Sequence, residues 1–123
     1  MAPDGQNNDN LELLLEKIEN GICELVLNCP DKRNPLSTAM LKAIENSLLK
    51  ISKEKTIKVV ILSANGPVFS AGHDLKEMRA NTNYKFIHEL FLQCSRTMLQ
   101  ITRLPQPVIA KVNGIATAAG CQL

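Results

Sequence analysis

The chain of 123 residues has no tryptophan, and aromatic residues make up only 3% of it. Hydrophobic residues still amount to 45%, an ordinary share for a globular protein. We therefore expect a core built from Leu, Ile, Val and Ala. The length is sufficient for one modest domain and too short for two.

An excess of charge of one sign is also absent. The sequence has 14 basic and 12 acidic residues, for a net charge of +2, and the basic residues are scattered along the chain. Such a balance argues against nucleic acid or a membrane surface as a partner. No apolar run is long enough to span a bilayer.

The four cysteines, Cys23, Cys29, Cys94 and Cys121, lack the C-x-x-C spacing of zinc and redox sites. We expect no metal site, and buried thiols in a reducing compartment. Cys23 and Cys29 are expected on one face of a strand, where cysteine acts as a small hydrophobe.

The first ten residues, MAPDGQNNDN, are polar and contain no arginine. They do not have the composition of a mitochondrial transit peptide, which is rich in arginine and poor in acids. We predict a disordered tail over residues 1–10 and one partial domain over residues 11–123.

The pattern of apolar residues predicts alternating strands and helices. Asn20-Gly21 lies between two apolar runs within Leu11–Cys29, which indicates an antiparallel hairpin. Ser37 can cap a helix over Thr38–Lys53, whose inner face would hold Met40, Leu41, Ile44, Leu48 and Ile51.

The second part of the chain continues in the same way. The run Ile57–Ala64 predicts a strand buried on both faces, which ends at Asn65-Gly66-Pro67. A second helix is expected over Tyr84–Arg103, before Pro105 and Pro107, and a further strand at "VIAKVNG". We expect one side of this helix, its inner face, to hold Phe91, Leu92, Ser95, Leu99 and Thr102. This alternation predicts the α/β class.

Two turns of very small residues each follow a predicted buried strand. One is Ser70–Asp74, where Asp74 and Glu77 resemble a capping box, so a helix is expected to begin just after Asp74. The other is Ala118–Gly120. Backbone N–H groups at such turns can form an oxyanion hole, and a free helix start attracts negative charge. Small residues equally permit close packing of helix on strand, and spacing alone leaves both readings open.

The segments "VVILSANGPVFSAGHDLKEM" and "PVIAKVNGIATAAGCQL" resemble the two signature segments of the crotonase family, also called the enoyl-CoA hydratase/isomerase superfamily. The segment "DKRNPLS" is similar to the coenzyme A loop of that family. The resemblance covers roughly Gly21 to Leu123. It implies the N-terminal half of a crotonase/ClpP-like ββα spiral fold.

The resemblance also implies an activity and a site. The family binds acyl-coenzyme A thioesters and stabilises the enolate of the thioester carbonyl with two backbone N–H groups, which here would belong to His73 and Ala119. Lys32 and Arg33 would approach the phosphates. The residues implied to contact the substrate are Lys32, Arg33, Ala71, His73, Asp74, Leu75, Lys76 and Ala119.

One position departs from the family pattern. Hydratases of the family use two glutamates, and Gln122 stands where the first would be. An amide does not take a proton at neutral pH, which argues against hydratase activity. A non-catalytic acyl-CoA binder is therefore an alternative. Ser70, His73 and Asp74 contain the residue types of a hydrolase triad, but neighbours within one turn rarely converge, and His73 is expected to act through its N–H group.

For the whole protein, the resemblance implies fatty-acid metabolism, a homotrimer or hexamer, and coenzyme A as part of the substrate with no permanently bound cofactor. It implies mitochondria, although no import signal is visible, and the cytoplasm otherwise. Because Leu123 falls within an expected helix, we also expect a fragment of a longer protein, which by itself would be inactive.

Overall fold

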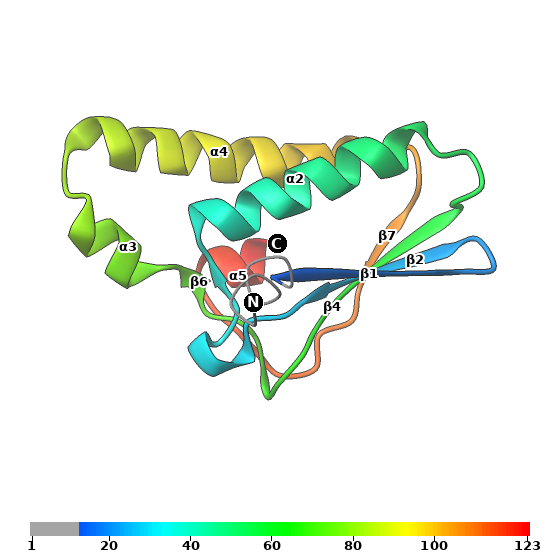
Figure 1. Ribbon diagram of the computed structural model, residues 1–123, viewed down its shortest axis with the longest axis horizontal. Helices are drawn as coiled ribbons and strands as arrows, with labels where there is room; N and C mark the ends of the chain where they lie inside the picture. Colours follow the sequence, from blue (N-terminus) through cyan, green and yellow to red (C-terminus); the bar gives the residue numbers. More distant parts are fainter. Residues whose placement is uncertain (1–12) are drawn as a thin grey trace, which may run out of the picture.

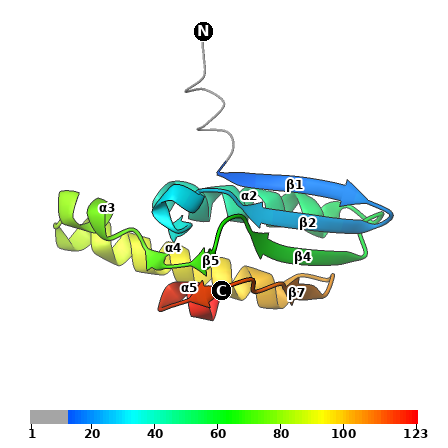
Figure 2. The same ribbon diagram turned by 90° about the horizontal axis from the view of Figure 1, so that it is seen from below.

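The computed structural model describes residues 13–123, and its centre is one four-stranded sheet (Figures 1 and 2). The strand order is β1-β2-β4-β7, with β1 antiparallel to β2 and the other neighbours parallel. The predicted tail over residues 1–10 lies outside the described residues. The strands of this sheet are β1 (Leu14–Glu19), β2 (Ile22–Leu27), β4 (Val59–Ala64) and β7 (Val108–Ala110).

The hairpin between β1 and β2 turns at the predicted residues. Asn20 has φ 53° and Gly21 has φ 81°, so both adopt the left-handed conformation that a two-residue hairpin loop requires. Glu19 pairs with Ile22 across this turn. The Asn-Gly signal therefore places both the hairpin and its register.

Two long helices, α2 (Thr38–Lys53) and α4 (Tyr84–Arg103), lie side by side over one face of the sheet (Figures 1 and 2). The bounds of both helices are as predicted. The hydroxyl of Ser37 accepts a hydrogen bond from the Met40 N–H, which is the expected N-cap. The predicted inner face of α2 is buried against β2 and β4.

The predicted inner face of α4 is wrong. Phe91, Leu92 and Leu99 are 47%, 43% and 48% exposed, and Ser95 and Thr102 are exposed as well. The buried residues of α4 are instead Leu90, Cys94 and Thr97. Apolar residues occupy two faces of this helix, so their periodicity alone does not choose between them.

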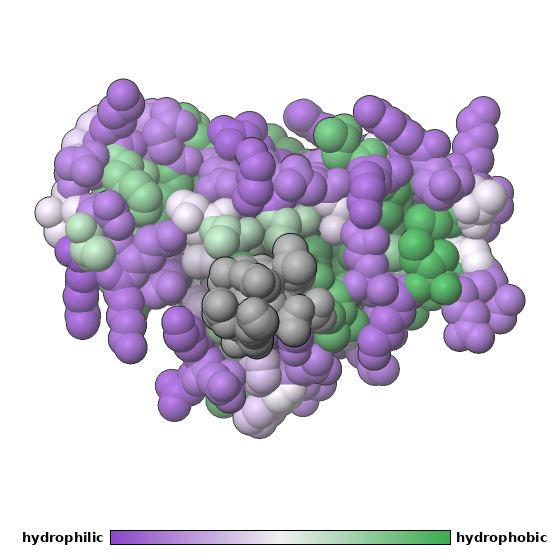
Figure 3. All heavy atoms as spheres, in the orientation of Figure 1, coloured by the Kyte–Doolittle hydropathy of each residue, from purple (hydrophilic) through white to green (hydrophobic). Residues whose placement is uncertain are grey.

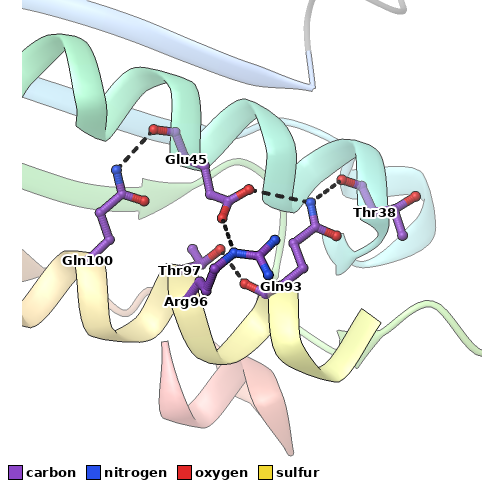
Figure 4. A network of polar contacts seen from close by, with 6 residues as sticks. All are labelled: Thr38, Glu45, Gln93, Arg96, Thr97 and Gln100. Carbon is purple, nitrogen blue, oxygen red and sulfur yellow. Dashed lines mark hydrogen bonds and ion pairs between the residues drawn. The ribbon is translucent and has the colours of Figure 1, made fainter. Parts of the chain in front are cut away.

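Polar contacts with α2 accompany the orientation that α4 adopts (Figure 4). The Gln93 amide donates to the Thr38 carbonyl and to the Glu45 carboxylate, and the Gln100 amide donates to the Glu45 carbonyl at 3.1 Å. Arg96 lies 3.6 Å from the Glu45 carboxylate. Gln93 and Gln100 thus face α2, and the stripe with Phe91 and Leu99 turns away from it.

Two expectations for the strands also need correction. Val60 and Leu62 of β4 are buried, but Val59 and Ile61 on the opposite face are only half-buried, because the described helices cover one side of the sheet. Cys23 is buried in β2, whereas Cys29 follows the end of that strand. All four thiols are free, and Cys121 is exposed rather than buried.

Short elements at one end of the molecule connect segments that are far apart in sequence. β3 pairs with β6, and β5 pairs with β8, both in parallel. These pairs bring residues 35–36 to 72–73 and residues 68–70 to 115–116. The short elements are η1 (Pro30–Lys32), β3 (Pro35–Leu36), β5 (Val68–Ser70), β6 (Gly72–His73), α3 (Leu75–Ala80), β8 (Ile115–Ala116) and α5 (Ala119–Gln122).

Candidate active site

A pocket of about 510 Å³ opens where η1, β6 and the start of α3 meet. It contains every residue that the family resemblance implies to contact the substrate, with the exception of Ala119. Its walls combine three cations, two carboxylates and several apolar groups. The lining residues are Asp31, Lys32, Arg33, Pro35, Ala71, His73, Asp74, Leu75 and Lys76.

The loop that carries Lys32 and Arg33 is held in a defined shape. Arg33 and Asn34 have φ 66° and 50°, two successive left-handed residues that turn the chain back toward β3. The Ala71 N–H donates to the Arg33 carbonyl at 3.0 Å. This bond ties the cationic loop directly to the segment that leads into β6.

The two small-residue turns lie against each other. Gly72 has φ +90°, and a methyl group on it would come within 3.1 Å of the Thr117 carbonyl oxygen and 3.3 Å of the Ala119 nitrogen. The Thr117 N–H donates to the Ser70 carbonyl at 3.0 Å. Gly72 is thus required both for its backbone conformation and for this close approach.

Ala118 has an unusual backbone conformation for a residue with a side chain, φ 51° and ψ −125°. It immediately precedes α5 and therefore sets the direction of the Ala119 N–H. Within residues 13–123 this N–H has no hydrogen-bond acceptor. Strain of this kind concentrates at functional sites, and here it orients a free donor beside Gly72.

Close packing alone explains why residue 120 is a glycine, with no catalytic role needed. A methyl group on Gly120 would collide with the Ser70 carbonyl oxygen and would lie 2.7 Å from the Ser70 side chain. Gly120 therefore allows α5 to pack directly on β5. The close-packing interpretation of the small-residue turns therefore applies to Gly120.

The start of α3 differs from the expectation. Asp74 caps the helix as predicted, and its carboxylate accepts from the N–H groups of Lys76 and Glu77. These donors are consequently already engaged and do not form a free anion site. Glu77 does not complete a capping box, because its carboxylate accepts from the N–H and hydroxyl of Thr38 at 3.0 and 2.6 Å.

The side chain of His73 packs against Phe91, with ring centroids 5.2 Å apart. Its Nδ1 is buried and has no hydrogen-bond partner among residues 13–123. Burial lowers the pKa of this imidazole below its ordinary value of 6.5, so the neutral form is favoured.

The structure contains no triad of Ser70, His73 and Asp74. The Ser70 hydroxyl donates to the Asn34 carbonyl, and the Asp74 carboxylate caps α3. Gln122 lies exposed on α5 and does not line the pocket.

Asn34 is an important residue that the sequence analysis missed. It is fully buried, and its side chain bonds to three backbone groups from two segments. The sequence feature that could have identified this residue is an asparagine directly after Lys32 and Arg33, at a position where the chain reverses direction. Asparagine tolerates the left-handed conformation better than other residues with side chains.

A second hollow contains none of the motif residues. Figure 3 shows apolar surface where Figure 1 places the end of α2 beside the β1–β2 hairpin. A pocket of about 410 Å³ in this part of the fold is lined by Ile18, Ile51 and Ile57, with charged side chains around them.

No helix within residues 13–123 is long and apolar enough to cross a membrane.

Comparison with known proteins identifies the family. The enoyl-CoA hydratase/isomerase family model matches residues 17–123. The mitochondrial enoyl-CoA hydratase domain-containing protein 3 of Homo sapiens is 50% identical over 103 residues, which cover 84% of this chain and 34% of that protein. The protein of the same name from Danio rerio is 45% identical over 115 residues, covering 94% of this chain and 40% of the relative.

Solved structures agree with this match. An enoyl-CoA hydratase of Mycobacterium smegmatis superposes with a TM-score of 0.88 at 49% identity, covering 90% of this chain and 44% of that one. The human domain-containing protein 3 gives a TM-score of 0.85 at 48% identity, with coverages of 89% and 44%.

The chain thus spans between a third and a half of the length of these relatives. The expected α/β crotonase-type fold is confirmed over the part that is described. The match to residues 17–123 shows that the chain belongs to the enoyl-CoA hydratase/isomerase family.

Proposed function

We propose that this chain binds an acyl-coenzyme A thioester and stabilises the enolate of its carbonyl through the backbone N–H groups of His73 and Ala119. The observation that carries the proposal is the pocket itself. It brings Lys32 and Arg33 into one hollow with Ala71 to Lys76, although about forty residues of sequence separate the two groups.

Each part of the pocket suits one part of such a ligand. Lys32, Arg33 and Lys76 are cations that favour phosphate groups, and arginine can bind them in bidentate fashion. The free Ala119 N–H lies next to Gly72, which precedes His73. Two backbone donors aimed at one carbonyl oxygen would favour the enolate over the neutral thioester, because negative charge develops on that oxygen.

Calorimetric titration with a saturated acyl-coenzyme A tests the proposal. Replacing both Lys32 and Arg33 by Ala should weaken binding by at least roughly tenfold, since hydrogen bonds to charged groups are worth about 1.5–3 kcal/mol. The same replacement of Lys42, an exposed residue of α2 outside the pocket, should change the affinity by less than about twofold. Equal effects of the two changes, or no binding by the wild-type protein, would refute the proposal.

A second candidate function is acyl-CoA binding without hydration, and Gln122 is the observation that favours it. An amide at this position can hold a water or a substrate carbonyl but cannot activate water by taking its proton. Gln122→Glu should create or raise hydratase activity on an enoyl-coenzyme A if this carboxylate is all that the chain lacks. An absence of any gain would leave the binder standing, or show that the second carboxylate used by the family is missing as well.

The remaining expectations concern the whole protein. Relatives that carry the word mitochondrial in their names support a proposed mitochondrial location. A role in fatty-acid metabolism is proposed from the family resemblance alone. Fractionation of cells that produce the protein tests the location. Mass measurement of the intact native protein tests both the proposed trimer or hexamer and the proposed greater chain length, and a monomer of 13.5 kDa would refute both.

A further inference from the structure

Asn34 joins the cationic loop to the segment that leads into the site. Its Oδ1 accepts from the Cys29 N–H at 2.7 Å, and its own N–H donates to the Cys29 carbonyl at 2.9 Å. These two bonds close the loop over residues 29–34. Lys32 and Arg33 lie within this closed loop and line the pocket.

The same side chain reaches the opposite segment. Its Nδ2 donates to the carbonyl oxygens of Asn65 and Val68, each at 2.9 Å. The Asn34 carbonyl in turn accepts from the Ser70 hydroxyl at 2.9 Å. Every polar atom of Asn34 is thus paired, and the residue is 0% exposed.

We propose that Asn34 is a positioning residue that sets the distance between the phosphate-binding cations and the thioester-binding strand. The inference rests on the proposed binding of acyl-coenzyme A. Asn34 is fully buried and does not line the pocket. It holds the loop of Lys32 and Arg33 in position relative to Ala71 and His73. Only a ligand that has both a nucleotide and a thioester contacts both parts, so only its affinity depends on the distance between them.

A purely structural role makes a different prediction. A general loss of stability would weaken the binding of all ligands alike, whereas loss of positioning affects only the ligand that uses both ends. Two ligands separate these cases: an acyl-coenzyme A, and the acyl-pantetheine thioester with the same acyl group, which lacks the nucleotide.

Asn34→Asp is the first variant, because the carboxylate has the same shape but cannot donate to the two carbonyl oxygens. We expect its Kd for acyl-coenzyme A to rise about tenfold and its Kd for the acyl-pantetheine to stay within about twofold of the wild-type value. Both constants are measured by calorimetry or ligand-observed NMR on the intact protein.

Gln106→Glu is the matched control. Gln106 is likewise a buried amide that donates to several backbone carbonyls, those of Ile51, Glu54 and Ile57, but it does not line the pocket. Gln106→Glu should lower the melting temperature without changing the ratio of the dissociation constants for acyl-coenzyme A and acyl-pantetheine.

Asn34→Gly is the second variant, because glycine adopts φ 50° without strain and leaves room for water. It should change the ratio in the same direction. An unchanged ratio in the folded variants overturns this inference alone, and so does a failure of both variants to fold, since Asn34 would then act on stability only. No binding of either ligand by the wild-type protein overturns the proposed function and this inference together.

Discussion

His73 lines the candidate pocket, and Ala118 directly precedes the free N–H of Ala119. His73 lies in β6 and packs its imidazole on Phe91, while its N–H belongs to the strand that lines the pocket. Ala118 adopts an unusual conformation that directs the N–H of Ala119. At the scale of single residues, substitutions at His73 and Ala118 should change the stability of the protein measurably.

Stability should depend on pH through His73. Burial lowers its pKa in the folded state below 6.5, while in the unfolded chain it titrates near that ordinary value. Between the two values the unfolded state binds more protons, so the free energy of unfolding decreases as the pH falls through 6.5 and is fully recovered above it. Urea unfolding between about pH 5 and 8 should show a smaller decrease in His73→Gln than in the wild type. Identical pH profiles would contradict the role of His73.

Ala118→Gly should raise the free energy of unfolding by an amount between about 0 and 2.5 kcal/mol. Glycine adopts a positive φ without strain, and relief of strain of about 1–3 kcal/mol exceeds its entropic cost of about 0.5–1 kcal/mol. Ala43→Gly within α2 is the control and should instead lower stability by about 1 kcal/mol. Chemical denaturation measures both, and a loss of stability in Ala118→Gly would show that this conformation is unstrained.

At the scale of elements, α3 is a short helix that depends on its neighbours. It contains six residues, too few to be stable alone. Asp74 caps its first turn, and Glu77 links it to the start of α2. Since Leu75 and Lys76 of α3 line the pocket, the contact between Glu77 and Thr38 supports the wall of the site.

A double-mutant cycle with Glu77→Ala and Thr38→Val should give a coupling energy of about 1 kcal/mol or more, because Thr38→Val removes the hydroxyl that donates to the Glu77 carboxylate. The pair of Glu45 and Arg96, in which the Arg96 side chain is 60% exposed, is the control. Its cycle should give less than about 0.5 kcal/mol, as is usual for surface ion pairs. Additive effects of the changes at Glu77 and Thr38 would show that the contact does not support α3.

At the scale of the whole molecule, the two motif segments meet because distant strands pair. β5 aligns with β8, β6 aligns with β3, and α5 packs on β5 where Gly120 meets Ser70. The free N–H of Ala119 thereby comes to lie next to the residue that precedes His73. The site therefore requires the packing of parts that are about fifty residues apart in sequence.

Gly120→Ala should disturb stability and the site together. The added methyl group would collide with the backbone of Ser70, so overpacking should lower the free energy of unfolding by about 1–3 kcal/mol. Displacement of α5 should also weaken acyl-coenzyme A binding. Gly21→Ala, at φ 81° in the distant hairpin, should reduce stability but leave binding unchanged. Unchanged binding in folded Gly120→Ala would separate α5 from the site.

The turns and the helix ends of this protein can be predicted from its sequence alone. Asn20-Gly21 predicts the hairpin, Ser37 and Asp74 cap their helices, and the prolines after Arg103 end α4, because these effects act within a few residues. The motifs also identified the family and most of the residues that line the pocket.

Tertiary structure alone decided which of two apolar faces α4 buries, which residue Glu77 binds, and what Asn34 holds together. Each outcome depends on groups that pack from distant segments: Gln93 and Gln100 on Glu45, Glu77 on Thr38, and the Asn34 amide on the chain after β4. A periodic pattern in the sequence predicts that a side chain will be buried or will form a hydrogen bond. Only the packed chain supplies the particular partner, because that partner comes from another element.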